Sequence, residues 1–469
     1  MVFAHVNFFR SLESVARELD CRGHEVVVLH GSRALTDEAT TTAQSADLTS
    51  EKRKRTDRKS AMLRRTVELA QAELPRISFG YRPMPEESWQ QKLHVGRQLM
   101  NRSVYFRKAH PSNRTVEALD KMLPPRLQKR LQRRVVRFAL ARPLALRIWR
   151  GIEAASPASR TIVSVLEEIK PDVVVISPTV WVKEPVEVDY VRAARSLGIP
   201  TVGYVASWDN LTSKGTIHLV PDVLALWNES LAKEARQIHS ISRKAIRLTG
   251  APYLDLLFQL HQTLSQRDMC ERMGCLTDRP YIVYLCSSPT LIASEVGAVT
   301  ALAETLAQQL GPEAPTIVVR PHPVNPTPWE DYAHSGVVVY PRSGDLAAGS
   351  PAWQDYYNQL SGSECVVGLN TTAFLEAVVA DRPCLTIVAD EFVGVQGQTG
   401  HFRHLLDGGF LEICHTVTDV STRVGRILAG ADENRLNRRL FLNSFLRPAG
   451  PSTPAATSFV AILESLVSP

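Results

Sequence analysis

Residues 316–323 of the chain read TIVVRPHP, so an apolar, β-branched run leads directly into an arginine, two prolines and a histidine. A run of this kind, without polar alternation, is typical of a strand that is buried on both faces of a parallel sheet. In open α/β sheets, ligands bind beyond the carboxyl ends of the strands. The segment therefore predicts a parallel α/β fold and places Arg320 and His322 at the edge of the sheet where a ligand would bind.

Similar runs recur along the chain, each beside a stretch with helical periodicity. They form two sets, at 26–30, 172–178, 201–207, 223–227 and 246–250, then at 281–288, 337–342, 365–370 and 384–390. Strands that alternate with helices predict two doubly wound, Rossmann-like α/β domains. We expect a first domain at 1–258, a second at 276–446, and a tail with a last short helix at 447–469.

The strand pattern is missing between about residues 40 and 160, where arginine-rich helical stretches replace it. We therefore expect a helical insertion in the first domain. Ten lysines and arginines and no acidic residue lie between Lys121 and Arg150. Apolar residues and arginines alternate around 131–148, which suits peripheral contact with an anionic membrane; an ordinary amphipathic helix packed on the first domain is the alternative. The basic runs lack interleaved aromatic residues, so we expect no nucleic-acid partner.

The composition is that of a globular protein, with 44% hydrophobic and 22% charged residues and a mean hydropathy of -0.10. No apolar run reaches the roughly 18–20 residues that a membrane span needs, and no signal-peptide pattern is present. We expect a cytoplasmic protein that works, in the membrane-contact hypothesis, at the inner face of the membrane. An Asp-x-Asp motif is missing too, so we expect neither a catalytic metal nor a cofactor.

Polar and charged residues gather after three strands of the second domain, where we expect a pocket for a nucleotide diphosphate. A cation, hydroxyl donors and backbone N–H groups suit anionic oxygens, and a carboxylate one turn into a helix suits ribose hydroxyls. Structural alternatives are helix capping, a strand end with a surface ion pair, and a solvated helix face. The candidate donor-binding residues are Ser287, Ser288, Arg320, His322, Asn370, Thr371, Thr372 and Glu376.

The loop after the run at 201–207 is the candidate acceptor side. Asp209 is our candidate for the general base that takes the proton of an acceptor hydroxyl. Trp208, Asn210 and Lys214 are candidates for contact with the acceptor or with phosphate. His5 is the second candidate base, because histidine titrates near neutral pH. The structural alternative for the loop is a turn stabilised by the Asp side chain, with the tryptophan packed beneath it.

Taken in order, these residues resemble the GT-B superfamily of glycosyltransferases. The segments that carry the resemblance are 5–26, 249–252, 370–377 with 382–383, and 398–402, the last being similar to bacterial surface-polysaccharide members. The resemblance implies two Rossmann-like domains that face a cleft, with the nucleotide donor carried mainly by the second. It covers about residues 1–40 and 165–450, and it leaves out the helical insertion.

The chain also resembles, more distantly, the CDP-glycerol glycerophosphotransferases of teichoic acid synthesis. Trp208 and Lys214 match their tryptophan–histidine–glycine loop and its downstream lysine, and Arg320, His322 and Pro323 match a later motif. Asp209 stands where that family has the histidine. This difference favours a sugar donor over a glycerophosphate donor.

The function implied is transfer of a sugar from a nucleotide-activated donor to a hydroxyl of a saccharide or lipid-linked acceptor, in surface polysaccharide or glycolipid synthesis. A sugar-nucleotide 2-epimerase shares this architecture, including a His-Pro motif and a Glu-Ala helix, and is the first alternative. A non-catalytic binding protein of the same fold is the second.

Overall fold

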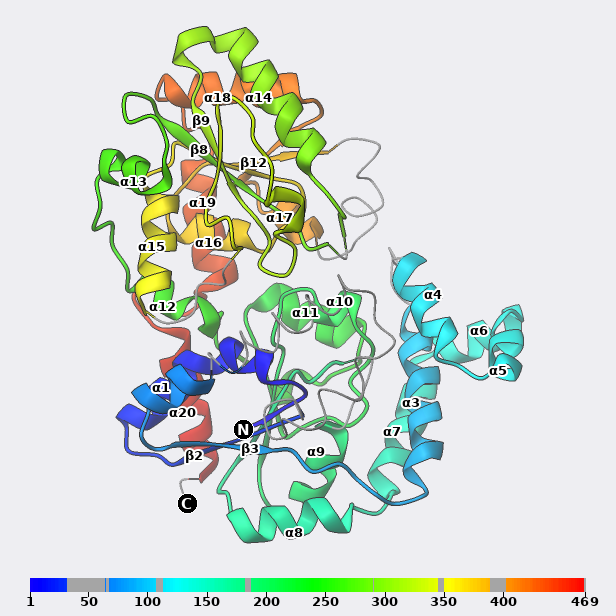
Figure 1. The fold of residues 1–469 in the computed structure, drawn as a ribbon. Coiled ribbons are helices and arrows are strands. Elements are labelled where there is room, and N and C mark those ends of the chain that lie inside the picture. The colour runs from blue at the N-terminus through cyan, green and yellow to red at the C-terminus, as the bar shows by residue number, and fades with distance from the viewer. Residues whose placement is uncertain are drawn as a thin grey trace. The chain divides into compact units, whose positions relative to one another are not determined.

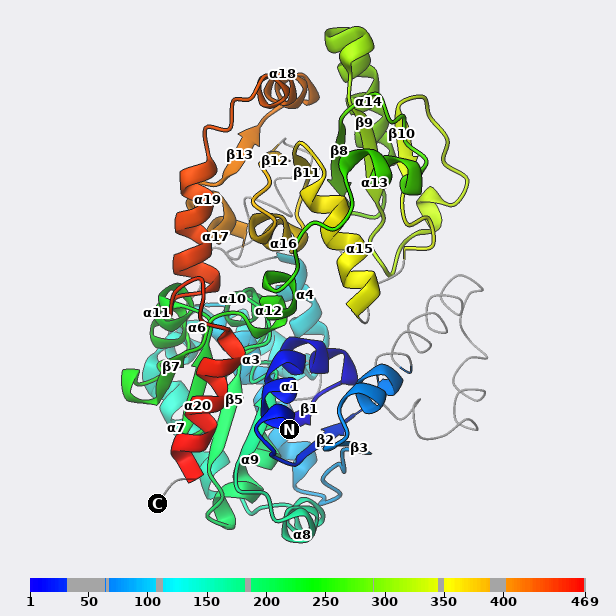
Figure 2. The same cartoon turned by 90° about the vertical axis from the view of Figure 1, so that its left-hand side faces the viewer.

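The structure is a computed structural model that describes residues 1–31, 64, 67–106, 113–181, 187–289, 291–344, 350–388 and 402–467. The described residues fall into two compact units. Those of Met1–Thr41, Ala70–Asp255 and Asn443–Pro469 form the first unit, and those of Thr42–Leu69 and Leu256–Leu442 form the second. The last helix, α20 (Ala455–Val467), thus belongs to the first unit, where it packs against α1 (Glu13–Cys21) (Figure 2).

The first unit contains a seven-stranded parallel sheet in the order β3-β2-β1-β4-β5-β6-β7 (Figure 1). This order extends the strand order 3-2-1-4-5-6 of doubly wound folds by one strand, which confirms the predicted architecture. Four consecutive positions in β4 are buried, as expected for a strand covered on both faces. The strands are β1 (Val2–Phe3), β2 (Val26–His30), β3 (Ile77–Tyr81), β4 (Val174–Ser177), β5 (Thr201–Tyr204), β6 (Val223–Leu226) and β7 (Ile246–Leu248).

The prediction of a strand-free insertion at 40–160 is wrong at one point. Strand β3 lies inside that range and pairs in parallel with β2 along its whole length, from Val26↔Ile77 to His30↔Tyr81. It is an edge strand, and only its first residue is fully buried. An edge strand keeps one side toward solvent and needs no continuous apolar run, so the sequence signal is weak.

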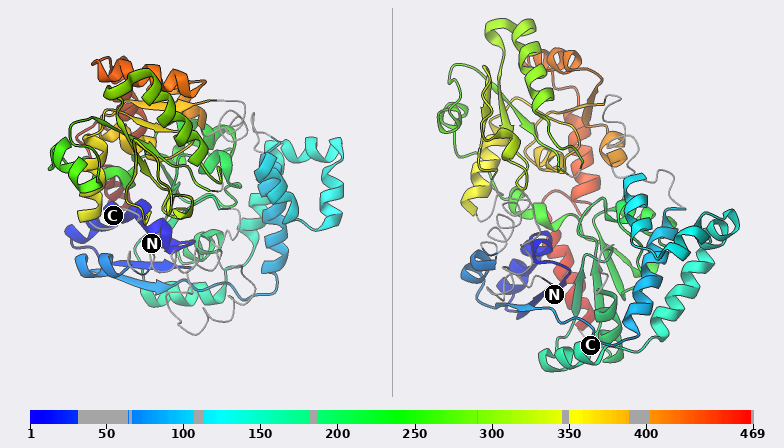
Figure 3. Two further views of the ribbon diagram at one scale, coloured as in Figure 1. Left: turned by 45° about the horizontal axis from the view of Figure 1, so that its top comes forward. Right: turned by 45° about the vertical axis from the view of Figure 1, so that its right-hand side comes forward.

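Helices α3–α7 follow β3 within the insertion, and Figure 3 shows their far end standing away from the first sheet. Their bounds are α3 (Gln90–Val104), α4 (Asn113–Lys121), α5 (Pro125–Leu131), α6 (Arg134–Ala141) and α7 (Pro143–Ala155). The other helices of the unit are α8 (Arg160–Ile169), α9 (Glu187–Ser196), α10 (Asn210–Ser213) and α11 (Glu229–Gln237), with a 3-10 helix at Val6–Leu12.

A buried network of four charges fastens the insertion to the first unit. Arg97 on α3 binds Glu153 on α7 at 2.7 Å and Asp189 on α9 at 2.9 Å, and Arg192 on α9 binds both of the same carboxylates. All four side chains are at most 5% exposed. Two positive and two negative charges balance each other, so the network avoids an unpaired buried charge.

The second unit contains a six-stranded parallel sheet in the order β10-β9-β8-β11-β12-β13. Its strands are β8 (Tyr281–Leu285), β9 (Thr316–Arg320), β10 (Val337–Val339), β11 (Val366–Gly368), β12 (Cys384–Ile387) and β13 (Leu411–Cys414). Its helices are α13 (Gln266–Met273), α14 (Val296–Leu310), α15 (Ser350–Ser361), α16 (Ala373–Val379), α17 (Phe402–Asp407), α18 (Val417–Leu428) and α19 (Arg435–Phe441), with α12 (Asp255–Phe258) at the junction of the units.

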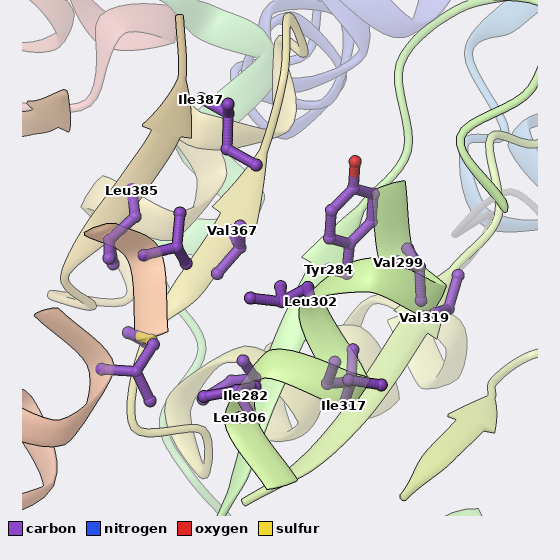
Figure 4. Packing of buried hydrophobic residues seen from close by; sticks show 14 of the residues in the cluster. Ile282, Tyr284, Val299, Leu302, Leu306, Ile317, Val319, Val367, Leu385 and Ile387 are labelled. Atoms are coloured by element: carbon purple, nitrogen blue, oxygen red, sulfur yellow. The ribbon is translucent and has the colours of Figure 1, made fainter. Parts of the chain in front are cut away.

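The core of the second unit lies between this sheet and two helices, α14 and α18. Figure 4 shows the strands contributing Ile282, Ile317 and Val367, while α14 contributes Leu302 and Leu306. All five side chains are fully or almost fully buried. Such a core fixes the positions of the strand ends, and these carry the polar residues described next.

Candidate functional site

The predicted donor residues follow three strands that are neighbours in the second sheet. β9, β8 and β11 lie side by side and run in parallel, so their carboxyl ends meet at one edge. Arg320 ends β9, Ser287 follows β8 by two residues, and Asn370 follows β11 by two residues. The edge is the one at which open α/β sheets bind ligands.

Arg320 and Glu376 come together through a third residue that the sequence did not point to. The Arg320 guanidinium lies over the ring of Tyr356, 4.0 Å from its centroid, and donates to Oε1 of Gln359 at 2.8 Å. The Tyr356 hydroxyl in turn donates to Oε2 of Glu376 at 2.7 Å. Burial lowers the pKa of Arg320, against the attraction of Tyr356 and Glu376, which raises it. Tyr356 therefore contacts both the guanidinium of Arg320 and the carboxylate of Glu376.

Ser287 links two of the strand ends. Its Oγ donates to Oε1 of Glu295 at 3.1 Å and accepts from the backbone N–H of Asn370 at 3.1 Å. Its backbone N–H donates to Oε2 of Glu295 at 2.7 Å. Burial raises the pKa of Glu295 to about 7, against the hydrogen bonds from Ser287, which lower it. Ser287 and Glu295 thus organise the loop after β8.

The remaining predicted donor residues lie on the same strand ends. The Val324 N–H donates to Nδ1 of His322 at 3.3 Å, and the Ala373 N–H donates to Oγ1 of Thr371 at 3.3 Å. Thr372 stands at the N-cap of α16, but its side chain makes no capping bond. Ser288 accepts from two backbone N–H groups through its carbonyl oxygen. The structure therefore does not support the alternative in which the Thr372 side chain caps helix α16.

In the first unit, the candidate acceptor loop follows β5 and is held by hydrogen bonds around Asp209. One carboxylate oxygen accepts from Oγ of Ser213 at 2.6 Å and lies 3.7 Å from Nζ of Lys214, and the other accepts from Nδ2 of Asn210 at 3.1 Å. The Asp209 side chain is 21% exposed. Trp208 is buried beneath the loop. The loop brings Asp209, Asn210 and Lys214 together.

The insertion braces this loop from one side. The Tyr105 hydroxyl at the end of α3 donates to the carbonyl oxygen of Ser213 at 2.6 Å and contacts that of Lys214 at 3.0 Å. Oδ1 of Asn101 accepts from the N–H of Thr216 at 2.9 Å. These hydrogen bonds from α3 and its C-cap fix the backbone of the loop that carries Asp209 and Lys214.

The other candidate base, His5, follows β1 at the same carboxyl edge of the first sheet, two strands away from β5. It precedes a 3-10 helix, and its carbonyl oxygen accepts from the N–H of Phe8 at 2.9 Å. His5 and Asp209 therefore share an edge of one sheet and come from separate loops.

Arg82 is a charged residue of this edge that the sequence analysis missed. It follows β3 directly and is 1% exposed, and within the described part of the chain its Nε and Nη1 have no hydrogen-bond partner. Burial raises the pKa of Glu187, at the start of α9, to about 7, and the nearby charge of Arg82 lowers it. The signal was available, because Tyr81-Arg82-Pro83 repeats the strand–Arg–Pro pattern of Arg320-Pro321.

Some of the predicted motifs fall outside the described residues. One is most of the segment at 398–402, and another is a basic run at 52–55 of the sequence, Lys-Arg-Lys-Arg. Across the described residues, no three His, Cys, Asp or Glu side chains gather in a way that could hold a metal ion.

No family model and no curated protein matches the chain. Solved structures do match it at low sequence identity. The UDP-GlcNAc 2-epimerase from Neisseria meningitidis bound to UDP-GlcNAc matches with a TM-score of 0.51 at 13% identity, over 100% of this chain and 99% of that one. The calicheamicin glycosyltransferase CalG4 matches with a TM-score of 0.50 at 11% identity, over 100% of this chain and 98% of that one.

Part of the wall teichoic acid polymerase TagF is also similar, with a TM-score of 0.39 at 11% identity, over 56% of this chain and 61% of that one. Identities this low bear on the fold and not on the reaction. Two parallel α/β sheets with their helices, and matches that cover the whole chain, give the fold class: the chain has the GT-B fold.

Proposed function

We propose that this chain is a glycosyltransferase that moves a sugar from a nucleotide-activated donor to a hydroxyl of a saccharide or lipid-linked acceptor. The observation that carries the proposal is the convergence of Arg320, Tyr356 and Glu376 at the carboxyl edge of the second sheet. A half-buried guanidinium matches a diphosphate, and a nearby carboxylate matches the two hydroxyls of a ribose.

In this proposal the second unit binds the donor. Arg320 and His322 contact the diphosphate, Glu376 accepts hydrogen bonds from the ribose, and Thr371 and Thr372 offer hydroxyls beside them. Ser287, through Glu295 and the Asn370 N–H, holds the strand ends in place. Ser288 lies in the same loop. Support for these roles comes from their position on three adjacent strand ends.

The first unit supplies the acceptor side. The acceptor oxygen attacks the anomeric carbon, and the bond from that carbon to the diphosphate oxygen breaks with its electron pair leaving on the nucleotide. Asp209 takes the proton of the attacking hydroxyl, as an inverting displacement requires. The hydrogen bonds from Ser213 and Asn210 hold the Asp209 carboxylate in one orientation. Lys214, whose side chain is 34% exposed, contacts the acceptor or its phosphate. The prediction of the same role for Trp208 and Asn210 is corrected, because both side chains are buried and support the loop from within.

A sugar-nucleotide 2-epimerase is the second candidate, since an epimerase is among the matches that cover the whole chain. Incubation with UDP-N-acetylglucosamine alone separates the two functions. An epimerase converts the sugar without an acceptor, whereas a glycosyltransferase leaves its stereochemistry at C2 unchanged. Appearance of the C2 epimer by NMR would replace the transferase proposal with the epimerase.

Donor binding is tested first by a thermal-shift screen with nucleoside diphosphates. A ligand at about 100 times its dissociation constant adds about 2.7 kcal/mol of stability. Arg320→Ala and Glu376→Ala should each lower this shift, because each removes a charged hydrogen-bond partner worth about 1.5–3 kcal/mol. Arg426→Ala is the control, since Arg426 makes only a long surface ion pair with Glu433. Equal shifts in all four proteins would refute the donor site, and binding without turnover would favour a non-catalytic protein.

A further inference from the structure

Helices α6 and α7 carry large apolar side chains that are exposed to solvent. Helix α6 has no buried residue at all, and its Val135 and Phe138 are 80% and 63% exposed. On α7, Leu144, Ile148 and Ile152 are 63%, 59% and 47% exposed. Large aliphatic and aromatic side chains gathered on one short segment are not expected on a surface that meets only water.

Helix α7 is packed firmly on the first unit through its inner face, so a detached helix does not explain the exposure of its outer face. Its inner face is fastened to the first unit: Leu146 is buried, Trp149 donates to Nδ1 of His218 at 3.1 Å, and Arg150 donates to the carbonyl oxygens of Ile217 and His239. The outer residues recur every four positions, at Leu144, Ile148 and Ile152. Residues at i, i+4 and i+8 lie on one side of a helix, so they form a single stripe.

Exposed arginines flank the apolar residues, and acids are missing. Arg133, Arg134, Arg137, Arg142 and Arg147 are all exposed. The Arg142 guanidinium lies over the Phe138 ring, 4.1 Å from its centroid. Glu153 is the first acidic residue after Asp120, and it is buried in the ion network with Arg97 and Arg192. The face thus combines exposed apolar groups with positive charge.

We propose that the face of Val135, Phe138, Leu144, Ile148 and Ile152, here called the α6–α7 face, docks on the surface of an anionic lipid bilayer. The positive charge favours a lipid surface as the binding partner, because arginines with apolar neighbours match a surface where phosphate groups border acyl chains. Docking places the protein on the membrane and not through it, as no helix in the described part of the chain is long and apolar enough to span. The inference does not depend on glycosyl transfer.

The test is flotation of the purified full chain with two kinds of vesicle. One is phosphatidylcholine alone, and the other contains about 30% phosphatidylglycerol to supply negative charge. We expect recovery with the anionic vesicles at low salt and a fall in recovery at about 0.5 M salt, where charges are screened beyond a few ångströms. Equal recovery with both vesicles, or none with either, would overturn the proposal.

Two double variants separate the apolar and the charged contributions. Leu144→Ser/Ile148→Ser should lower vesicle affinity by about tenfold or more, because two buried aliphatic side chains are lost from the contact. Arg134→Gln/Arg147→Gln should weaken binding and flatten its salt dependence. The matched control is Leu436→Ser/Leu440→Ser, an exposed pair with the same spacing on α19. A loss of affinity in the control as large as that in the first variant would contradict the assignment to the α6–α7 face.

Light scattering after size exclusion tests whether a second copy of the chain is the occupant instead. The proposal predicts that the parent and the Leu144→Ser/Ile148→Ser variant have the same oligomeric state. If the variant dissociates an oligomer and binds vesicles as well as the parent does, the α6–α7 face is an interface between copies and the membrane proposal is wrong.

Discussion

The hydroxyl of Tyr356, on α15, donates a 2.7 Å hydrogen bond to Oε2 of Glu376, on α16. The tyrosine thereby fixes the orientation of the Glu376 carboxylate. The same ring supports the guanidinium of Arg320. One tyrosine on α15 thus positions both charged groups that we assign to the donor, and it can be altered without touching either of them.

Tyr356→Phe keeps the ring under Arg320 and deletes the hydrogen bond to Glu376. The carboxylate must then be ordered when the ligand binds, which costs about 0.5–1.5 kcal/mol. We expect the nucleotide dissociation constant to rise by about three- to tenfold, measured by calorimetry with the nucleoside diphosphate that the screen selects. Tyr357→Phe, the next residue on α15, is the control and should bind as the parent does. Unchanged or tighter binding by Tyr356→Phe would show that the tyrosine does not organise the site.

The raised pKa of Glu295 makes a pH-dependent contribution to stability. Burial raises it from 4.5 to about 7 in the folded protein, so between these values the unfolded chain loses the proton while the folded chain keeps it. The contribution of the protonated group is therefore fully present below about pH 4.5 and is lost as pH rises to 7. A shift of this size corresponds to about 3 kcal/mol.

Glu295→Gln removes this titration. We expect the parent to lose stability relative to the variant, by up to about 3 kcal/mol, as pH rises from about 4.5 to about 7. Urea unfolding of both proteins across that range gives the difference. The control is Glu304→Gln, on the exposed side of α14, whose free energy of unfolding should depend on pH as that of the parent does. Parallel curves for the parent and Glu295→Gln would mean that Glu295 is not buried in its neutral form.

Glu153→Ala tests the ion network that fastens the insertion. The change leaves Arg97 and Arg192 buried with Asp189 as their shared carboxylate, and breaking such a pair costs about 3–5 kcal/mol. The free energy of unfolding should fall by this amount, while Glu167→Ala on exposed α8 should change it by less than about 0.5 kcal/mol. Similar small losses in both variants would show that the network adds little to stability.

The same network predicts sensitivity to acid. The pKa of Asp189 is lowered: burial alone would raise it, but the charges of Arg97 and Arg192 outweigh burial. A lowered pKa stabilises the fold above the usual value of 3.8 and loses that effect as pH falls through the folded value. The contribution is therefore constant at neutral pH and disappears only in stronger acid.

Much of the fold followed from the sequence, because buried parallel strands leave continuous apolar runs. Of the strands that lie outside the predicted runs, two are at sheet edges: β3, whose residues are mostly half-buried, and β13 (Leu411–Cys414), where apolar and polar residues alternate. The predicted strands also ran too far in places, as with 201–207 against Thr201–Tyr204. Apolar residues just beyond a strand extend the run without extending the hydrogen-bonded ladder.

The site was predictable only where the chain itself leads from a strand into polar residues. Arg320, Asp209 and Asn370 follow strands and could be found this way. Tyr356 lies on a helix whose sequence carries no signal for a site, and Glu295 comes ten residues after β8. Their roles arise from contacts between elements far apart in the chain, which residue patterns do not encode.

In the proposed reaction, Asp209 acts as the base for transfer to an acceptor hydroxyl. Its carboxylate is held by Asn210, Ser213 and Lys214, an arrangement that would also suit a turn with no catalytic role. Ser213→Ala removes the shortest of these hydrogen bonds and keeps the carboxylate. It is therefore the matched control for a change that keeps the shape of Asp209 and removes its basicity.

The most direct measurement is the turnover of Asp209→Asn with a nucleotide sugar and its acceptor, beside Ser213→Ala and His5→Gln. We expect Asp209→Asn to lower kcat by about 100-fold or more. Nucleotide affinity and the melting temperature should stay near those of the parent. Ser213→Ala should keep most of its turnover. Near-normal turnover in Asp209→Asn, together with a large loss in His5→Gln, would contradict the account and assign the base to His5.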